Sequence, residues 1–442
     1  MERLIPAAVA LAATWIIGVG VFDENAGFPP VNEAVSDDVL EDTTAARWWK
    51  GNLHTHTFWS DGDDYPEMVV DWYRSRDYNF LALSDHNILS DKELWMDMSG
   101  GRGAGRPLVR YLDRFGDDWV ETRVRNNKTQ VRLKTLSEFR GLFEEPGEFL
   151  LIQSEEITDS AEGKPVHVNA TNIQELIRPQ RGKTVFEAMQ NNVNAVLEQR
   201  ERTGVPMFPH INHPNFGWAV TAEDLMKLEG EKFFEVYNGH PSVRNFGDAN
   251  HAGGELMWDI ILTVRLAELG KEVMYGMATD DAHNYFSYQI GRANPGRAWV
   301  VVRAVELTAA SIVAAMERGD FYGSTGVVLR NIVYDGKSLS IEIEPEEGVT
   351  YQTMFIGTRR GYDRSSEPIL NADGAPLAVT RKYSDEIGEV FSVVDGLSAS
   401  YTLHGDEIYV RAKVVSSKTK VNPFTAGETE VAWVQPVVPG TE

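Results

Sequence analysis

Histidines and carboxylates recur in this chain directly after short apolar runs of the kind that form strands. In Gly51-Asn52-Leu53-His54-Thr55-His56 two histidines lie one residue apart, and the alternation of a strand points both to the same face. The coincidence recurs at Ser84-Asp85-His86-Asn87, Ser154-Glu155-Glu156, His210-Ile211-Asn212-His213 and Asp280-Asp281-Ala282-His283. One histidine at a strand end is usually a core residue and one Asp there a cap, but five such ends together indicate a metal site.

The surrounding pattern alternates strand-like and helix-like segments, which favours a parallel sheet or barrel. Catalytic residues of α/β barrels collect at the carboxyl ends of the strands. The expected strands are 48–53, 80–83, 149–153, 207–211, 233–236, 273–277 and 299–302. The expected helices are 66–76, 184–200, 222–228, 258–269 and 308–318.

The two ends of the chain differ from this central pattern. The apolar run Leu4 to Phe22 is typical of a signal peptide or membrane anchor, with a buried N-terminal helix as the alternative. We therefore expect an exported protein, periplasmic or extracellular, with residues 1–22 as signal or anchor and 23–46 as a linker. Beyond about Phe321 short alternating runs predict a β-sandwich over 321–442, after an α/β barrel over 47–320.

Composition narrows the classes of partner. The formal net charge of −24 argues against nonspecific binding to nucleic acid or to an anionic membrane, so we expect a small-molecule substrate. The chain has no cysteine, which leaves His, Asp and Glu as its strong metal ligands.

A basic insertion at 92–148 interrupts the acidic chain. Its arginines and lysines either pair with Asp113, Asp117, Asp118 and Glu121 on a solvated helix, or form a lid that draws an anionic substrate towards the metals.

The ordered motifs resemble those of the PHP (polymerase and histidinol phosphatase) superfamily of metallophosphoesterases. The match spans about residues 47 to 290. It comprises His54-Thr-His56, Asp61-Gly62, Asp85-His86-Asn87, Glu156, His167, His213-Pro214 and Asp281-Ala282-His283. Details such as Glu156-Ile157-Thr158, His167-Val168-Asn169 and Ala432-Trp433-Val434-Gln435-Pro436 are similar to the CehA/McbA branch, which pairs this domain with a C-terminal β-sandwich.

The resemblance implies a distorted (β/α)7 barrel that holds two or three divalent metal ions. Carried over by position, it implies one ion at His54, His56, Glu156 and Asp281, a second at Glu156, His167 and His213, and a third at Asp61, His86 and His283. Glu155 competes with Glu156 and His210 with His213 for these positions. We expect Asp61, His86, Glu156 and His283 to take part in catalysis, and zinc, manganese and iron all suit such ligands.

The chemistry expected of this set is hydrolysis. Three divalent ions against three carboxylates leave roughly +3, and two ions leave about +1, which favours an anionic substrate and a metal-bound hydroxide as nucleophile. The first hypothesis is a phosphoesterase for a small phosphate ester, and the alternative is a carboxylester or carbamate hydrolase of CehA type. A noncatalytic binding protein is the third, because the sandwich could recognise a glycan or a surface partner.

Further residues are weaker candidates for the site. Asp85 and Asp280 are expected either to orient imidazoles or to cap helices. Asn238, His210 and Tyr285 lie beside strand ends and could bind substrate or protonate a leaving group.

Overall fold

The computed structural model describes residues 45–98 and 105–440, which belong to one compact unit over Thr44–Glu442. The predicted signal or anchor at 1–22 and nearly all of the predicted linker at 23–46 lie outside the described residues. Within the described ranges no helix combines the length and the apolar character needed to cross a membrane.

A 13-stranded sheet runs through most of the described chain, so the protein is a mixed α/β structure. Along the sheet the strands follow the order β10-β9-β8-β7-β6-β2-β1-β11-β12-β21-β20-β15-β18. The strands on the β10 side are β1 (Arg47–Asn52), β2 (Phe80–Leu83), β6 (Leu150–Ala161), β7 (Lys164–Thr171), β8 (Phe208–Ile211), β9 (Phe233–Asn238) and β10 (Tyr275–Thr279). The pairs β1–β2, β2–β6, β8–β9 and β9–β10 are parallel, as the sequence pattern predicted.

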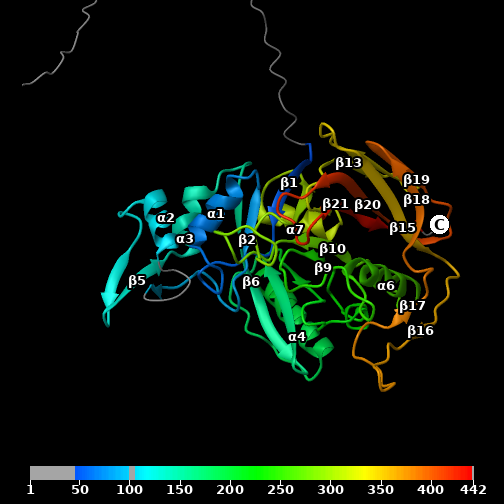
Figure 1. The fold of residues 1–442 in the computed structure, drawn as a ribbon, viewed down its shortest axis with the longest axis horizontal. Coiled ribbons are helices and arrows are strands. Elements are labelled where there is room, and N and C mark those ends of the chain that lie inside the picture. Colours follow the sequence, from blue (N-terminus) through cyan, green and yellow to red (C-terminus); the bar gives the residue numbers. More distant parts are fainter. Residues whose placement is uncertain (1–44, 99–104, 441–442) are drawn as a thin grey trace, which may run out of the picture. The chain divides into compact units, whose positions relative to one another are not determined.

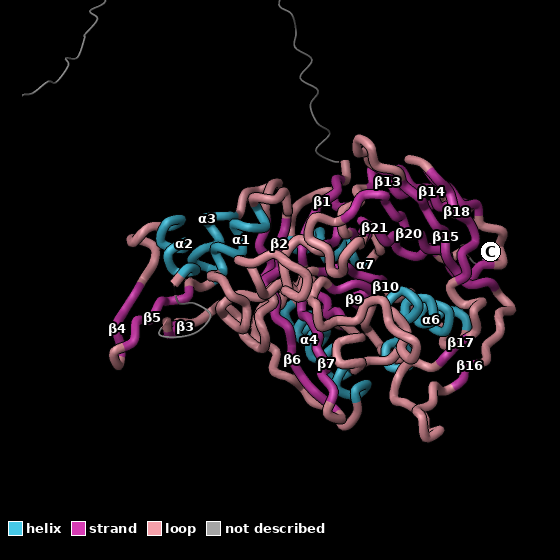
Figure 2. Tube along the Cα trace, in the orientation of Figure 1, coloured by secondary structure: helices cyan, strands magenta, loops and turns pink. Residues whose placement is uncertain are grey.

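One strand departs from the parallel pattern. β6 runs on to Ala161 and turns directly into β7, which is antiparallel to both β6 and β8 (Figure 2). The sequence analysis expected only 149–153 as a strand here. The tight turn at Glu162 and Gly163, both with positive φ, explains the hairpin, since these are the residues that reverse a chain in a short loop.

The sheet curls back on itself at the carboxyl ends of its parallel strands. The residues after β10 bridge those after β1 in parallel, at Ala282 and Thr55. The amide of His56 donates to the carbonyl of Ala282 (3.0 Å), and that of Asp281 donates to the carbonyl of His54 (3.0 Å). The chain segments that follow β1 and β10 therefore meet at this edge, although five strands separate β1 from β10 in the order of the sheet.

The helices that connect these strands begin and end where their capping residues predict. α4 (Val185–Thr203) starts at Thr184, whose side chain accepts the amide of Glu187, and ends at left-handed Gly204. α7 (Ala309–Glu317) has the equivalent cap at Thr308, and α1 (Pro66–Arg74) has proline in its first position. α5 (Ala222–Leu225) is a single turn, and α6 (Gly254–Ala267) begins four residues before its predicted start.

The insertion forms its own small layer beside α1 (Figure 1). It consists of β3 (Leu94–Asp97), α2 (Arg106–Phe115), β4 (Thr122–Arg125), β5 (Lys128–Leu133) and α3 (Leu136–Phe143). β5 lies between β3 and β4 in a three-stranded antiparallel sheet.

The C-terminal third is built of strands, as predicted. The strands are β11 (Trp299–Ala304), β12 (Phe321–Ser324), β13 (Leu329–Tyr334), β14 (Ser338–Ile343), β15 (Tyr351–Arg359), β16 (Ser366–Glu367), β17 (Lys382–Tyr383), β18 (Glu389–Asp395), β19 (Ser398–Thr402), β20 (Glu407–Thr419) and β21 (Thr429–Val437). The small sheet β13-β14-β19 and the far end of the large sheet share one apolar core, which includes Leu339, Phe355 and Val414. Because the large sheet continues through β11 and β12, the predicted domain boundary at 320/321 falls within a continuous sheet and stays a prediction.

Candidate metal centre

Four ligand atoms meet where the curled sheet closes. The Nε2 atoms of His54 and His56 each lie 3.2–3.3 Å from Glu156 Oε2 and from Asp281 Oδ1. Atoms that share one ion at tetrahedral angles, with bonds of about 2.0–2.2 Å, are separated by distances of this size. The four residues are those that the sequence analysis assigned to one metal.

Three of these atoms have no hydrogen-bond partner although they are buried. They are His54 Nε2, His56 Nε2 and Glu156 Oε2, and all three residues are fully buried. Nδ1 of His86 lies 2.8 Å from Glu156 Oε2, but its hydrogen bond is with Thr158 Oγ1. Leaving buried polar atoms unsatisfied costs about 1–3 kcal/mol each, so such atoms call for an explanation. Their convergence on one point fits a bound cation, which would satisfy all three together.

The other oxygen of Glu156 faces a second pair of histidines. Glu156 Oε1 lies 2.8 Å from His167 Nδ1 and 3.3 Å from His213 Nε2, and Asn212 donates to it at 2.8 Å. The structure thus brings together the three residues assigned to the second metal, although the tightest groupings join His167 with His86 and Glu156, and His213 with His54 and Glu156. Glu156 is the shared member, as expected of a bridging carboxylate.

The residues assigned to the third metal form the outer part of the cluster. Asp61 Oδ1 lies 3.2 Å from His283 Nε2 and 3.5 Å from His86 Nε2, and His56 joins the same group. Asp61 is about half exposed, whereas Glu156 is buried. All nine predicted ligands therefore belong to one cluster, with Asp61 on its open side.

The ligands come from the strand ends that the sequence pattern indicated. His54 and His56 follow β1, His86 follows β2, Glu156 lies within β6, His213 follows β8, and Asp281 and His283 follow β10. His167 is supplied by antiparallel β7, at the position opposite Thr158 of β6.

Local backbone features hold the ligands in place. Gly62 has no space for a side chain, since a Cβ there would lie 2.5 Å from the carbonyl oxygen of His56. Asn87, His213 and Asp281 have positive φ angles of 51°, 23° and 49°. Such strain costs about 1–3 kcal/mol per residue and clusters at functional sites, where the surrounding structure enforces it.

The charges in the cluster are strongly coupled. Burial alone would raise the pKa of Glu156, but the imidazoles of His86, His54 and His167 hold it well below its usual range. Burial alone would lower the pKa of His54, yet Asp281, Glu235 and Glu156 raise it well above its usual value. The imidazoles and carboxylates of the cluster thus shift each other's pKa towards the charged forms, against the effect of burial.

Glu235, at the third position of β9, is a site residue that the sequence analysis did not assign. Its fully buried carboxylate accepts the Nδ1–H of His54 at 2.7 Å. It also accepts the hydroxyl of Thr279 (2.7 Å), the amide of His213 (2.8 Å) and the side chain of Asn238 (2.8 Å). Glu235 thereby leaves Nε2 of His54 free to face the cluster. Its only sequence signal is a carboxylate inside a predicted buried strand.

Some of the weaker candidates support the ligands through hydrogen bonds, and others lie beside the cluster. The Tyr285 hydroxyl donates to the carbonyls of His56 and Ala282, and Asn238 donates to Glu235 and Asp281, so both support the ligands. His210 is fully buried, 3.5 Å from Glu235. His240, which was not assigned a role, has its ring centroid 5.3 Å from that of His283, and burial lowers its pKa to about 4.

Asp85 and Asp280 accept hydrogen bonds from backbone amides and hydroxyl groups rather than from imidazoles. Asp85 accepts the amide and hydroxyl of Thr57 (2.8 Å each) and the hydroxyl of Ser60 (2.6 Å). Asp280 accepts three successive amides, from Gly296 to Ala298, and the hydroxyl of Tyr73. Neither role matches the two expected for them, and the carboxylate that orients an imidazole is Glu235.

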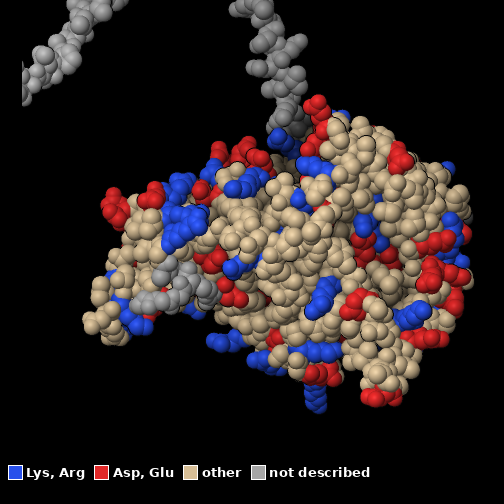
Figure 3. Space-filling view, viewed as in Figure 1, with Lys and Arg blue, Asp and Glu red and all other residues tan. Residues whose placement is uncertain are grey.

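The basic residues of the insertion pair with one expected partner and with two acids outside the insertion. Glu121 does bind Arg132 and Lys134, but Arg114 pairs with Asp71 of α1 and Arg110 lies 3.4 Å from Asp64. A group of basic side chains lies where Figure 1 places α2 (Figure 3). The role of the insertion as a lid stays a prediction.

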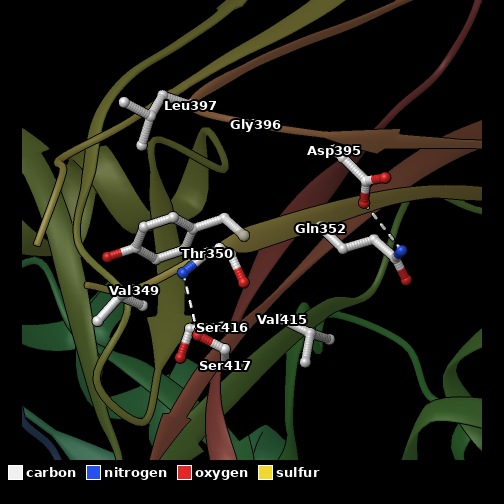
Figure 4. A pocket seen from close by; sticks show the side chains of 10 residues that line it. Val349, Thr350, Gln352, Asp395, Gly396, Leu397, Val415, Ser416 and Ser417 are labelled. Carbon is white, nitrogen blue, oxygen red and sulfur yellow. Dashed lines mark hydrogen bonds between the residues drawn. The ribbon is translucent and has the colours of Figure 1, made fainter. Parts of the chain in front are cut away.

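A separate hollow of about 650 Å³ lies among the C-terminal strands. Its walls include hydrogen bonds from the Thr350 amide to Ser417 Oγ and from Gln352 to Asp395 (Figure 4). It shares no residue with the histidine cluster. Its hydroxyl and amide groups are already partly paired with each other, whereas three buried ligand atoms of the cluster converge on one point without a hydrogen-bond partner.

Comparisons with known proteins find a similar solved structure but no matching family model or curated protein. No protein-family model and no curated protein matches the chain. Among solved structures it is similar to a two-domain protein from Bacteroides vulgatus ATCC 8482 that contains a predicted PHP-like metal-dependent phosphoesterase. The two chains share 13% identity over 89% of this chain and 96% of that one, with a TM-score of 0.36.

Proposed function

We propose that this protein is a metal-dependent hydrolase of the PHP type, and that its substrate is a small phosphate ester. The observation that carries the proposal is the convergence of His54 Nε2, His56 Nε2 and Glu156 Oε2, three buried atoms without hydrogen-bond partners. A distorted (β/α)7 barrel is part of the proposal, supported by the hydrogen bonds that link the ends of β1 and β10.

The donor set suits two or three divalent ions. His54, His56, Glu156 and Asp281 would hold one, and the second oxygen of Glu156 with His167 and His213 would hold another. Asp61, His86 and His283 would hold the third. Bound divalent cations polarise a phosphoryl oxygen and lower the pKa of water. Zinc, manganese and iron fit these nitrogen and oxygen ligands.

The residues of the chain have distinct parts in this chemistry. Glu235 fixes the orientation of His54, and Asn212 and Asn238 hold the carboxylates of Glu156 and Asp281. Asp61 lies on the exposed side, so the substrate would approach there. With two or three ions bound, the three ligand carboxylates leave a net charge of roughly +1 to +3, which favours a phosphate over a neutral ester. Export from the cytoplasm remains part of the proposal.

The test uses the purified full chain and measures metal content by elemental analysis together with hydrolysis of three substrates. These are p-nitrophenyl phosphate, bis-p-nitrophenyl phosphate and p-nitrophenyl acetate. We expect two or three ions per chain and turnover of a phosphate ester, both reduced in His56→Ala and unchanged in His404→Ala, the control outside the cluster. Turnover of the acetate alone would indicate a carboxylester hydrolase instead. A chain that stays inactive and binds no metal after loading with zinc or manganese would refute the proposal.

A further inference from the structure

His240 lies at the mouth of the cluster without being one of its ligands. It follows β9 by two residues, and its ring stands nearly edge-on to His283, with 5.3 Å between the ring centroids. His240 is partly exposed, whereas His54 and His56 are fully buried. In the described part of the chain, the groups of side chains close enough to share one ion do not include His240. Its ring is therefore available for another role beside the ligands.

Its hydrogen bonding identifies which ring nitrogen carries the proton. The amide of Ser242 donates to His240 Nδ1 at 3.2 Å, so Nδ1 acts as the acceptor. A neutral imidazole carries one proton, and that proton is then on Nε2. His240 thus offers a hydrogen-bond donor, Nε2–H, next to a ligand on the exposed side of the cluster.

Two hydrogen bonds and one close backbone contact hold the backbone that carries His240. The His240 amide donates to Asn238 Oδ1 (2.8 Å), and the Gly239 amide donates to the carbonyl of Thr279 (2.9 Å). Gly239 packs so closely that a Cβ there would lie 2.8 Å from the carbonyl oxygen of Asp280. A donor on such a fixed segment needs little reorganisation during a reaction.

The C-terminal third supports the same segment. Arg297 donates from Nη1 to the Gly239 carbonyl at 2.8 Å. Lys420, from the turn between β20 and β21, donates to the carbonyl of Arg297 (3.0 Å) and to the hydroxyl of Tyr237 (3.1 Å). Tyr237 precedes Asn238 in the chain, so the end of β9 that leads into the His240 segment is fixed as well.

We propose that His240 is a catalytic residue that donates its Nε2–H hydrogen bond to a non-bridging phosphoryl oxygen of the substrate, where negative charge develops. No proton is transferred in this step, so the imidazole stays neutral. The inference rests on the proposed hydrolase function and adds to it the residue that stabilises the charged oxygen. It differs from acid catalysis, in which a proton would pass to the leaving group.

The test compares His240→Ala, His240→Gln and the control His251→Ala, a histidine that stacks on Trp218. The substrates are aryl phosphates whose leaving groups differ in acidity. We expect kcat of His240→Ala to fall about 100-fold to 1000-fold by the same factor for every leaving group, with KM little changed. Glutamine, which keeps a donor, should restore at least part of the loss. Metal content should stay that of the wild type in all three variants.

A second measurement follows the binding of orthovanadate, a mimic of the transferred phosphoryl group, by calorimetry of the metal-loaded chain. His240→Ala should weaken vanadate binding more than phosphate binding. Unchanged kcat and vanadate affinity in an active enzyme would overturn the inference alone, as would a loss that grows with poorer leaving groups or a loss of metal. A metal-loaded wild type that hydrolyses no phosphate ester would refute the proposed function itself.

Discussion

Two buried ionic clusters in this molecule are built from similar groups but differ in how far their atoms are satisfied. In the first, Glu156 and Asp281 lie among imidazoles, and three converging atoms have no hydrogen-bond partner. In the second, Asp259 of α6 accepts hydrogen bonds from Arg411 of β20 at both carboxylate oxygens, at 2.7 and 2.6 Å, and from the hydroxyl of Tyr409 (2.7 Å). Nη1 of Arg411 is left without a hydrogen bond, but both oxygens of the acid are satisfied. Both clusters are almost fully shielded from solvent.

The difference separates a binding site from a structural contact. A bidentate pair of carboxylate and guanidinium neutralises itself and leaves its acid nothing further to bind. A ring of imidazoles around a carboxylate presents lone pairs to a common centre and is completed by a cation. Unsatisfied buried atoms that converge on one point thus indicate a binding site more reliably than buried charge alone does.

The largest effect is expected from Glu156→Gln. An amide offers one weakly coordinating oxygen where the carboxylate offers two, and those two oxygens face histidines on opposite sides. Metal affinity should fall more than the roughly 100-fold that loss of a supporting contact costs, and hydrolysis should fall with it. Elemental analysis and phosphate-ester turnover measure both.

Glu155→Gln is the matched control for this change. Burial raises the pKa of the neighbouring Glu155 to about 8, and its side chain accepts the amide of Ile177 at 2.6 Å. A neutral carboxyl and an amide are similar, so metal content and activity should be retained. Equal losses in the two variants would contradict the distinction between them.

The second prediction concerns the pair of Asp259 and Arg411. Asp259→Ala leaves the buried Arg411 without its main partner and should lower the free energy of unfolding by about 3–5 kcal/mol. The metal content of the folded protein should not change. Urea unfolding followed by tryptophan fluorescence measures the loss, and Asp259→Ala with Arg411→Met should recover most of it. A loss of metal at unchanged stability would reverse the assignment of the two clusters.

The third and smallest effect is expected at Glu67, a buried carboxyl whose partners are neutral. It accepts the hydroxyl of Tyr111 (2.6 Å) and the indole of Trp119 (2.9 Å), and burial raises its pKa from 4.5 to about 7. The folded state therefore binds the proton more tightly than the unfolded chain. The contribution to stability is full below pH 4.5 and is lost as the pH rises towards 7.

Glu67→Gln keeps an acceptor for both donors and removes this dependence. Relative to the wild type, the variant should gain stability between pH 4.5 and about 7, on the order of 3 kcal/mol, and then stay level. Unfolding curves at several pH values test the trend. A difference between the two proteins that does not vary with pH would show that burial does not perturb Glu67.

Much of the site was predictable because it depends on local order in the sequence. His54, His86 and Asp281 each follow an apolar run, and parallel strands bring such positions to one edge of a sheet. The helix caps at Thr184 and Thr308 are equally local. Which carboxylate of the pair Glu155 and Glu156 faces the histidines also follows from alternation along β6, once one face of that strand is known to be the inner one.

Other features depended on contacts between segments far apart in the chain. The antiparallel hairpin of β6 and β7 brings His167 to Glu156, and Glu235 reaches His54 across 181 residues. The bridge between Thr55 and Ala282 closes the edge. The sequence by itself determined the donor types, their order and the strand ends that carry them, since residue type and periodicity are local properties. Only the tertiary structure decided which donors lie against the same oxygen of Glu156 and which carboxylate orients an imidazole. It also decided which histidine lies beside the cluster without belonging to it. All three depend on side-chain packing between distant segments of the chain.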